Sequence, residues 1–192
     1  MTVSTMPTRP STPPAGTSHP EWGRSTELLP HEAANLATIA TVAPLWSTHD
    51  IPALLEHYAD DIVWRNVAMG EVYDGKEAVR AFLERLFAAL PDIELEVTLR
   101  VPRGKYVAEE YVLRGTHLGT MFGLPPTGRR LEIKVMSMLE LRDGLMKEDH
   151  FYFDAASVMR QMGYFPEASA AEKLPGRIVL GLVSRLVRRR SR

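Results

Sequence analysis

The chain lacks cysteine altogether. That absence excludes a disulfide framework and a thiol nucleophile, and it suits a protein of a reducing compartment. No apolar run reaches the about 20 residues that a membrane-spanning helix needs, and the N-terminal segment has no apolar stretch typical of a secretion signal. We therefore expect a soluble, cytoplasmic protein.

Sequence motifs for the common cofactors are missing as well. HExxH, CxxC and closely spaced histidine pairs do not occur, so the positions of the six histidines do not predict a metal site. The P-loop, the dinucleotide-binding fingerprint and the nucleophile elbow are also absent. We expect neither a metal nor an organic cofactor.

Acidic residues are missing from one end of the chain. Residues 173–192 contain seven Lys and Arg residues and no Asp or Glu, although the formal net charge of the whole chain is −1. The remainder is therefore acidic, and the basic run has no interleaved aromatic residues, so we expect no specific nucleic-acid binding. Apolar residues at helical spacing within residues 176–192 predict a basic amphipathic helix. It either lies on a membrane surface, which would make the protein membrane-peripheral, or packs on the domain or a dimer mate.

Composition divides the chain into three parts. Residues 1–30 are crowded with Pro, Ser and Thr, and such a segment buries too little apolar surface to order itself, so we predict disorder there. Residues 31–166 carry the periodic patterns of a folded domain. Residues 167–192 form a linker and the basic amphipathic helix.

Hydrophobic periodicity changes along the folded part from helix to strand. Helical spacing predicts a helix from His31, a short helix capped by Asp50 and a third helix that Pro91 ends. The predicted strands cover residues 62–67, 93–101, 105–117, 130–142 and 145–153, and a short final helix stops at Gly163. Helices first and long strands later predict an α+β fold.

The last predicted strand, within the stretch EDHFYFD, carries the most chemistry. Alternation places Asp149, Phe151 and Phe153 on one face, and Glu148, His150, Tyr152 and Asp154 on the other. A carboxylate that points into an apolar pocket has a perturbed pKa, which acid–base catalysis uses. Asp149 is therefore a candidate catalytic acid or base.

A second candidate acid lies in the strand 105–117. Glu109 and Glu110 are adjacent, so one of them faces inward. We single out Glu110 as a catalytic candidate. The alternative is an ion pair with Arg114 or with a basic residue of a neighbouring strand, because buried charges are usually paired.

Several other polar, aromatic and methionine side chains complete the candidate site. Asn66 shares a strand face with Trp64 and either orients a substrate or is a satisfied core amide. His117, where a strand enters a Gly- and Pro-rich loop, either assists catalysis or hydrogen-bonds the turn. Met136 and Met138 are assigned with Trp64, Asn66 and Phe151 to substrate binding.

Long stretches of the chain resemble a known family. LLEHYADDIVWRNVAMGEVYDGKEAVRAFLERLFAALPDIELEV and EEYVLRGTHLGTMFGLPPTGRRLEIKVMSMLELRDGLMKEDHFYFDAASVMRQMG resemble the SnoaL-like polyketide cyclases of the nuclear transport factor 2-like superfamily. GTHLG with GLPPTGRR, the hairpin RDG and YFDAASVMRQMG carry the likeness, which covers residues 32–165. YADDIVWRN and VYDG are also similar to limonene-epoxide hydrolases of that superfamily.

The resemblance implies a cone, in which a curved antiparallel sheet is wrapped by helices around an apolar pocket, and a homodimer formed through the sheet. It also implies acid–base catalysis by a pocket carboxylate without metal or cofactor. Such enzymes of secondary metabolism close aldol rings, open epoxides or shift double bonds of apolar substrates of polyketide or terpenoid type.

The family's catalytic positions transfer only in part. Asn66 matches the water-positioning asparagine of the epoxide hydrolases and Trp64 matches their adjacent tyrosine. Their arginine and aspartate on the third strand correspond to Glu110 and Val112, so we do not expect limonene-type hydrolysis.

The acid of the last strand is also displaced. The position that is an aspartate in both groups corresponds to Phe151, and we expect Asp149, two residues earlier on the same face, to take its place. Asp154 then caps the final helix. Two hypotheses follow: a cyclase or isomerase, or a module that binds an apolar ligand or dimerises without chemistry.

Overall fold

The computed structural model describes residues 28–166. Disorder is predicted for residues 1–30; residues 1–27 lie outside the described residues, and at the end of the predicted stretch the first helix already begins at Pro30. The basic helix predicted within residues 167–192 also lies outside the described residues. The described elements are α1 (Pro30–Thr48), α2 (Ile51–Glu56), β1 (Tyr58–Asn66), β2 (Glu71–Asp74), α3 (Lys76–Ala89), β3 (Glu94–Arg103), β4 (Tyr106–Thr116), β5 (Arg130–Arg142), β6 (Leu145–Phe153) and α4 (Ala155–Met162).

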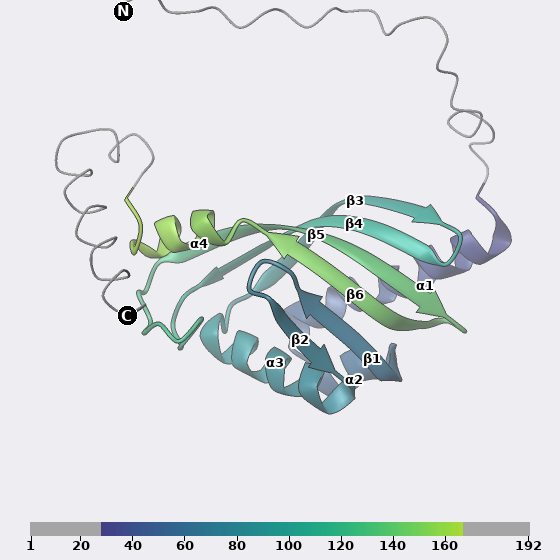
Figure 1. Ribbon diagram of the computed structural model, residues 1–192, viewed down its shortest axis with the longest axis horizontal. Coiled ribbons are helices and arrows are strands. Elements are labelled where there is room, and N and C mark those ends of the chain that lie inside the picture. The colour runs from purple at the N-terminus through teal and green to yellow at the C-terminus, as the bar shows by residue number, and fades with distance from the viewer. Residues whose placement is uncertain (1–27, 167–192) are drawn as a thin grey trace, which may run out of the picture.

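All of the strands belong to one six-stranded sheet with the order β2-β1-β6-β5-β4-β3. β3 to β6 form an antiparallel meander, whereas β1 pairs with β6 in parallel. The predicted α+β class and the curved sheet with helices around it are therefore confirmed, with the difference that the sheet is mixed (Figure 1). The parallel pair arises because β6, the last strand of the meander, lies beside β1 and runs in the same direction.

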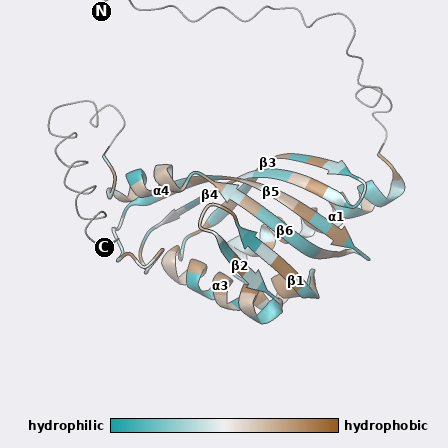
Figure 2. Cartoon of the chain, in the orientation of Figure 1, coloured by the Kyte–Doolittle hydropathy of each residue, from teal (hydrophilic) through white to brown (hydrophobic). Residues whose placement is uncertain are grey.

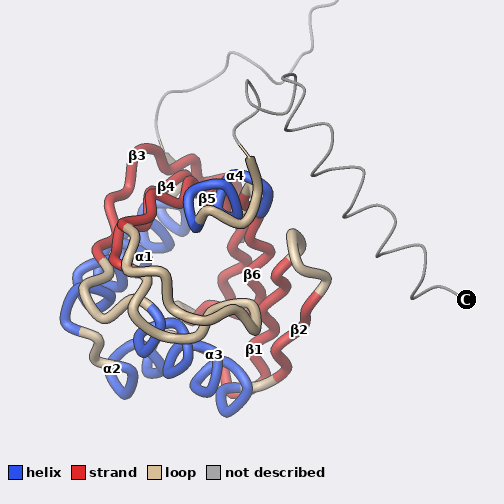
Figure 3. The backbone as a smooth tube through the Cα atoms, turned by 90° about the vertical axis from the view of Figure 1, so that its left-hand side faces the viewer, coloured by secondary structure: helices blue, strands red, loops and turns tan. Residues whose placement is uncertain are grey.

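The sheet curls around one side of the molecule, and α1, α2 and α3 close the other side (Figure 3). α1 packs against β3, whereas α3 packs against β1 and β2. Within the described residues, no helix is long and apolar enough to cross a membrane. This arrangement leaves the inner face of the sheet and the inner faces of the helices directed at one another.

Local sequence signals set the ends of the elements. The Asp50 carboxylate accepts a hydrogen bond from the Ala53 amide at 3.0 Å, and Asp154 caps α4 in the same way through the Ser157 amide at 2.9 Å. The β5–β6 hairpin turns at Asp143 and Gly144, whose φ angles of 54° and 77° are those of a type I′ turn. The predicted cap at Asp154 is thus present.

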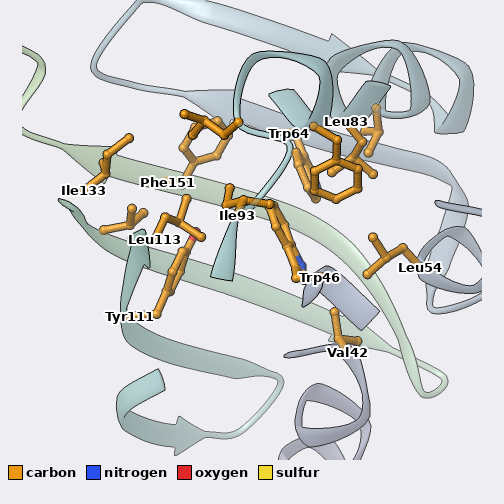
Figure 4. Close-up of a cluster of buried hydrophobic side chains, with 14 of the residues drawn as sticks. Val42, Trp46, Leu54, Trp64, Leu83, Ile93, Tyr111, Leu113, Ile133 and Phe151 are labelled. Carbon is orange, nitrogen blue, oxygen red and sulfur yellow. The ribbon is translucent and has the colours of Figure 1, made fainter. Parts of the chain in front are cut away.

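The core lies between the helices and the inner face of the sheet (Figure 4). α3 contributes Val79, Leu83 and Phe87, which recur every four residues and are buried. Strict alternation continues along β5, where Val135, Ser137 and Leu139 are buried while Met136 and Met138 are exposed. The bands of alternating hydropathy follow the same period along the strands (Figure 2).

Candidate active site

A cavity of about 310 Å³ lies between the inner face of the sheet, α1, α3 and the loop of residues 117–129. Its walls are mainly apolar and aromatic. The lining residues are Trp46, Trp64, Asn66, Glu71, Phe82, Arg85, Leu86, Ala89, Tyr111, Leu113, Thr120, Met121, Phe122, Gly123, Ile133, Val135, Asp149, Phe151 and Phe153. A cavity of this volume with mainly apolar and aromatic walls is typical of a small-molecule site.

Three aromatic rings from three elements form one wall of the cavity. Trp64 of β1, Phe82 of α3 and Phe151 of β6 contact one another, with ring centroids 5.7 to 6.0 Å apart and planes inclined at 45° to 74°. Such inclined contacts are favourable for aromatic quadrupoles. The wall presents flat apolar surface to a ligand and holds Trp64 and Phe151 in fixed orientations.

Asp149 is the buried acid of this cavity. It lies on β6, with Trp64 as its register partner on β1 and Leu139 on β5, and it is 6% exposed. Its Oδ1 has no hydrogen-bond partner among the described residues. Burial raises the pKa of the Asp149 carboxyl from 3.8 to about 7; the nearby Ser137 hydroxyl lowers it and the charge of Glu109 raises it. Near neutral pH the carboxyl therefore exists in both protonation states.

Hydroxyl groups lie beside Asp149 on the inner face of the sheet. The hydroxyls of Tyr111 and Ser137, on adjacent strands β4 and β5, are 3.2 Å apart and hydrogen-bonded. Burial raises the pKa of Tyr111 well above its usual value, so its phenol keeps its proton and remains able to donate. The site therefore contains a titrating acid and a phenol that does not titrate.

A polar cluster lies next to the aromatic wall, where β1 turns into β2 and Asn66 is the register partner of Phe151. The Asn66 amide nitrogen donates to Glu71 Oε2 at 3.1 Å, and the Tyr73 hydroxyl donates to the same oxygen at 2.6 Å. Asn66 Oδ1 accepts from the Met69 amide at 3.3 Å. Burial and the Glu71 hydrogen bond raise the pKa of Tyr73 to about 12. Asn66 is thus part of the cavity wall, and protein groups fix both ends of its amide.

The paired acids of β4 point to opposite sides of the sheet. Glu109 faces inward, is 8% exposed and forms an ion pair with Arg100 of β3, with Nη2 2.7 Å from Oε1. Burial raises the pKa of Glu109, while the Arg100 charge lowers it. Glu110 faces outward, and its Oε1 accepts a hydrogen bond from the Thr98 hydroxyl at 2.6 Å. The structure therefore does not bring the predicted Glu110 into the cavity.

His117 also lies away from the cavity wall. It is fully buried, its Nδ1 is 3.0 Å from the Thr127 hydroxyl, and its backbone amide donates to the Arg129 carbonyl. The Leu118 and Gly119 amides donate to the Ala89 carbonyl at the end of α3. A Cβ on Gly119 would collide with the Ala88 carbonyl oxygen. His117 closes the base of the loop, and the loop is fastened to α3.

Met136 and Met138 lie on the outer face of β5, opposite the cavity. Among the lining residues that periodicity did not identify are Glu71, from a short edge strand, Arg85, from the exposed side of α3, and the loop residues 120–123. Among the described residues, no cluster of three or more His, Cys, Asp or Glu side chains is arranged to hold a metal ion.

Comparison with known proteins agrees with this architecture. The sequence model of the SnoaL-like polyketide cyclases matches residues 37–162. The nogalonic acid methyl ester cyclase of Streptomyces nogalater is 30% identical over 76 residues, which are 40% of this chain and 53% of that protein. The aklanonic acid methyl ester cyclase DnrD of Streptomyces peucetius is 29% identical over 90 residues, 46% of this chain and 62% of that protein.

The chain thus spans between 53% and 62% of the length of these two curated relatives. Among solved structures, IdmH from Streptomyces antibioticus is 29% identical and superposes with a TM-score of 0.59. The superposition covers 67% of this chain and 98% of IdmH. The likeness therefore extends over nearly the whole of a solved protein.

Proposed function

This chain belongs to the SnoaL-like polyketide cyclase family, and we propose that it is a cofactor-independent acid–base cyclase or isomerase. Its substrate would be an apolar polycyclic small molecule of polyketide type. The observation that carries the proposal is the buried Asp149 carboxyl, with an unpartnered oxygen, in the wall of an aromatic cavity. An acid whose pKa lies near 7 can take a proton and return it at neutral pH.

In a ring closure of aldol type, the Asp149 carboxylate removes a proton from a carbon next to a substrate carbonyl. The enolate carbon then attacks a second carbonyl of the same molecule, and the new alkoxide takes the proton back from Asp149. One carbon–carbon bond forms and no atom is lost, so the product has the mass of the substrate. In a double-bond shift, the same carboxyl returns the proton to a different carbon.

The cavity supports the remaining requirements of this chemistry. The wall of Trp64, Phe82 and Phe151 is suited to a flat, apolar ring system and excludes water from the reacting atoms. The Tyr111 phenol retains its proton and is available as a hydrogen-bond donor to a developing oxyanion. Asn66, whose amide is held by Glu71 and the Met69 backbone, positions the polar end of the substrate.

One observation favours a second function, a module that binds an apolar ligand without chemistry. By the family resemblance, Phe151 occupies the position of the usual acid of the last strand, and here its ring packs against Trp64 and Phe82. In that case the cavity would retain ligands unchanged, and Asp149 would have no effect on them.

The two functions differ in the fate of a test substrate. Purified protein is incubated with nogalonic acid methyl ester and aklanonic acid methyl ester, and the mixture is analysed by liquid chromatography with mass detection. From the wild type we expect a product of unchanged mass and new retention time. The Asp149→Asn variant should react about 100-fold more slowly or worse, because loss of an acid–base group usually lowers the rate on that scale.

Glu110→Gln is the matched control, because this acid lies on the outer face of the sheet and should leave the rate unchanged. Equal rates for the wild type and Asp149→Asn would refute the catalytic assignment. Recovery of unchanged substrate that co-purifies with the protein would favour the binding module.

A further inference from the structure

A second, smaller cavity lies on the other side of Asp149 from the main one. Its volume is about 40 Å³, and it shares Trp46, Trp64, Tyr111 and Asp149 with the main cavity. These four side chains therefore form a partition between the two spaces. We call the smaller space the inner chamber.

The inner chamber is lined by both polar and apolar side chains. The titratable or hydroxyl groups that face it are Tyr58 of β1, Glu109 and Tyr111 of β4, Ser137 of β5 and Asp149 of β6. α1 contributes apolar side chains, among them Val42 and Ala43, and β3 contributes Leu95. Arg100 completes the charged groups, through its ion pair with Glu109.

The chamber has the size and the chemistry to hold water. A single water needs a space of about 10–15 Å³ on the same measure and two or more polar partners, and an apolar space of this size would stay empty. Asp149 Oδ1 and the Trp64 indole nitrogen are buried and have no hydrogen-bond partner among the described residues. The two residues that carry this acceptor and this donor both line the chamber, and neither atom is used by another protein group among the described residues.

We propose that water in the inner chamber links Asp149 to Glu109, and that Glu109 is a positioning residue that controls the protonation of Asp149. The proposal deepens the proposed function, on which its catalytic meaning rests. Asp149 would face the substrate on one side and a proton acceptor on the other. A proton would leave the Asp149 oxygen for water as that water passes one of its own to the Glu109 carboxylate.

The ion pair makes Glu109 suitable for that role. Its side chain is 10% exposed and that of Arg100 is 21% exposed, so the pair lies at the boundary between the chamber and solvent. Arg100 stabilises the Glu109 anion, which can then release the proton to bulk water. The route is separate from the main cavity, so a bound ligand would not block it.

The test is a carboxyl titration of ligand-free protein, which needs no substrate. Protein labelled with ¹³C at the aspartate side-chain carboxyl is titrated by NMR, and the Asp149→Asn spectrum assigns the Asp149 signal. In Glu109→Gln we expect the Asp149 midpoint to fall by more than about 0.5 pH unit, because a like charge at short range has been removed. In Glu110→Gln, one residue along the strand but on the outer face, we expect no change.

A chamber-filling variant distinguishes the proposal from general damage. Ala43→Val adds two methyl groups to the α1 side of the chamber and leaves both carboxyls in place. Expelled water would leave Asp149 less solvated, so its midpoint should rise, whereas a loosened fold that admits solvent would lower it. A crystal structure of the wild type should show ordered water between Asp149 Oδ1 and Glu109.

An unchanged Asp149 midpoint in Glu109→Gln would overturn the proposal, and so would equal shifts in Glu109→Gln and Glu110→Gln. A dry inner chamber in the crystal structure would overturn the water link. None of these outcomes depends on turnover, so a failure of this proposal and a failure of the proposed cyclase activity are separate results.

Discussion

Trp64 and Asp149 are register partners in the parallel pairing of β1 with β6, so the indole and the carboxyl are neighbours on the inner face of the sheet. Trp64 is 3% exposed and Asp149 is 6% exposed. Neither the indole nitrogen nor the carboxyl Oδ1 has a hydrogen-bond partner among the described residues. Ionisation of Asp149 in this environment is costly, and that cost is measurable in the stability of the protein.

Asp149→Asn should stabilise the protein at neutral and higher pH. The folded pKa of about 7 exceeds the ordinary aspartate pKa of 3.8, so between these values the native state binds more protons than the unfolded chain. The free energy of unfolding of the wild type should therefore fall by at most about 4 kcal/mol as pH rises from about 4 to about 7. Above pH 7 it should stay constant. Asn carries no such penalty.

Urea unfolding of both proteins between pH 4 and pH 9 checks this expectation. The advantage of Asp149→Asn should grow through the window and stay constant above it. Glu110→Gln provides the baseline for a carboxylate on the outer face. A difference between Asp149→Asn and the wild type that does not change with pH would contradict the raised pKa.

Phe151→Ala should destabilise the fold and enlarge the cavity. The ring is buried against Trp64 and Phe82, and removal of a buried Phe side chain costs about 3–5 kcal/mol. Chemical denaturation measures the loss, with Phe165→Ala as the control because that ring is exposed beyond α4 and outside the sheet. A loss for Phe151→Ala no larger than that of the control would mean that Phe151 does not support the aromatic wall.

The outer face of the sheet should be a homodimer interface. Met136, Met138 and Tyr152 are exposed there on adjacent strands, and Leu99 and Val101 of β3 are exposed as well. Exposed apolar patches of this kind mark association sites. We expect the wild type to elute as a dimer in size exclusion with light scattering.

Met138→Glu should convert that dimer to a monomer, because it places a charge in the centre of the patch. Leu118→Glu alters another exposed apolar residue outside the sheet, on the loop of residues 117–129, and should leave the dimer intact. A monomeric wild type at high concentration would refute the interface.

His117→Ala should loosen the loop that covers the cavity. The buried imidazole is hydrogen-bonded to the half-buried Thr127 hydroxyl, and the variant loses this bond, worth about 1 kcal/mol, together with the packing of the ring. Hydrogen exchange of the amides of residues 118–128 should accelerate, while that of β5 stays slow. Equal protection of the loop in the variant and the wild type would show that His117 does not fasten it.

The same histidine gives the loop a pH dependence. Burial lowers the pKa of His117 below its ordinary value of 6.5, so the unfolded chain binds the additional proton first. The stabilisation from the neutral imidazole is therefore present above pH 6.5 and is lost as pH falls below it. His117→Gln should lack this dependence.

Local patterns predicted most of the elements because their causes are local. The stripe of α3, the alternation of β5, the caps at Asp50 and Asp154 and the turn at Asp143 each depend on neighbouring residues. β2 was missed because its four residues are mostly exposed and form an edge with no apolar period. The parallel pairing of β1 with β6 was also missed, because it joins segments far apart in the sequence.

The site residues were predictable where the alternation of side chains along a strand determines which face of the sheet they lie on. Asp149 faces the cavity as its period of two requires, and Trp64 and Asn66 share its side of the sheet. For the two acids of β4, period alone does not say which one faces inward, and the register with β5 selects Glu109. Met136 and Met138 fall on the outer face for the same reason. Arg85 reaches the cavity from an exposed position of α3, which no apolar pattern marks.

The position of β6 also has a consequence for how the molecule assembles. This strand is the last of the sheet in the chain, yet it lies between β1, the first, and β5. Without β6, the β1–β2 hairpin and strands β3 to β5 would not be joined by backbone hydrogen bonds, and the sheet would be divided into two parts. Contacts between such distant segments form slowly, because a long loop must close before they are made. The step that joins the two halves is therefore also the step that brings Asp149 to Trp64, and before that step the cavity lacks its buried aspartate.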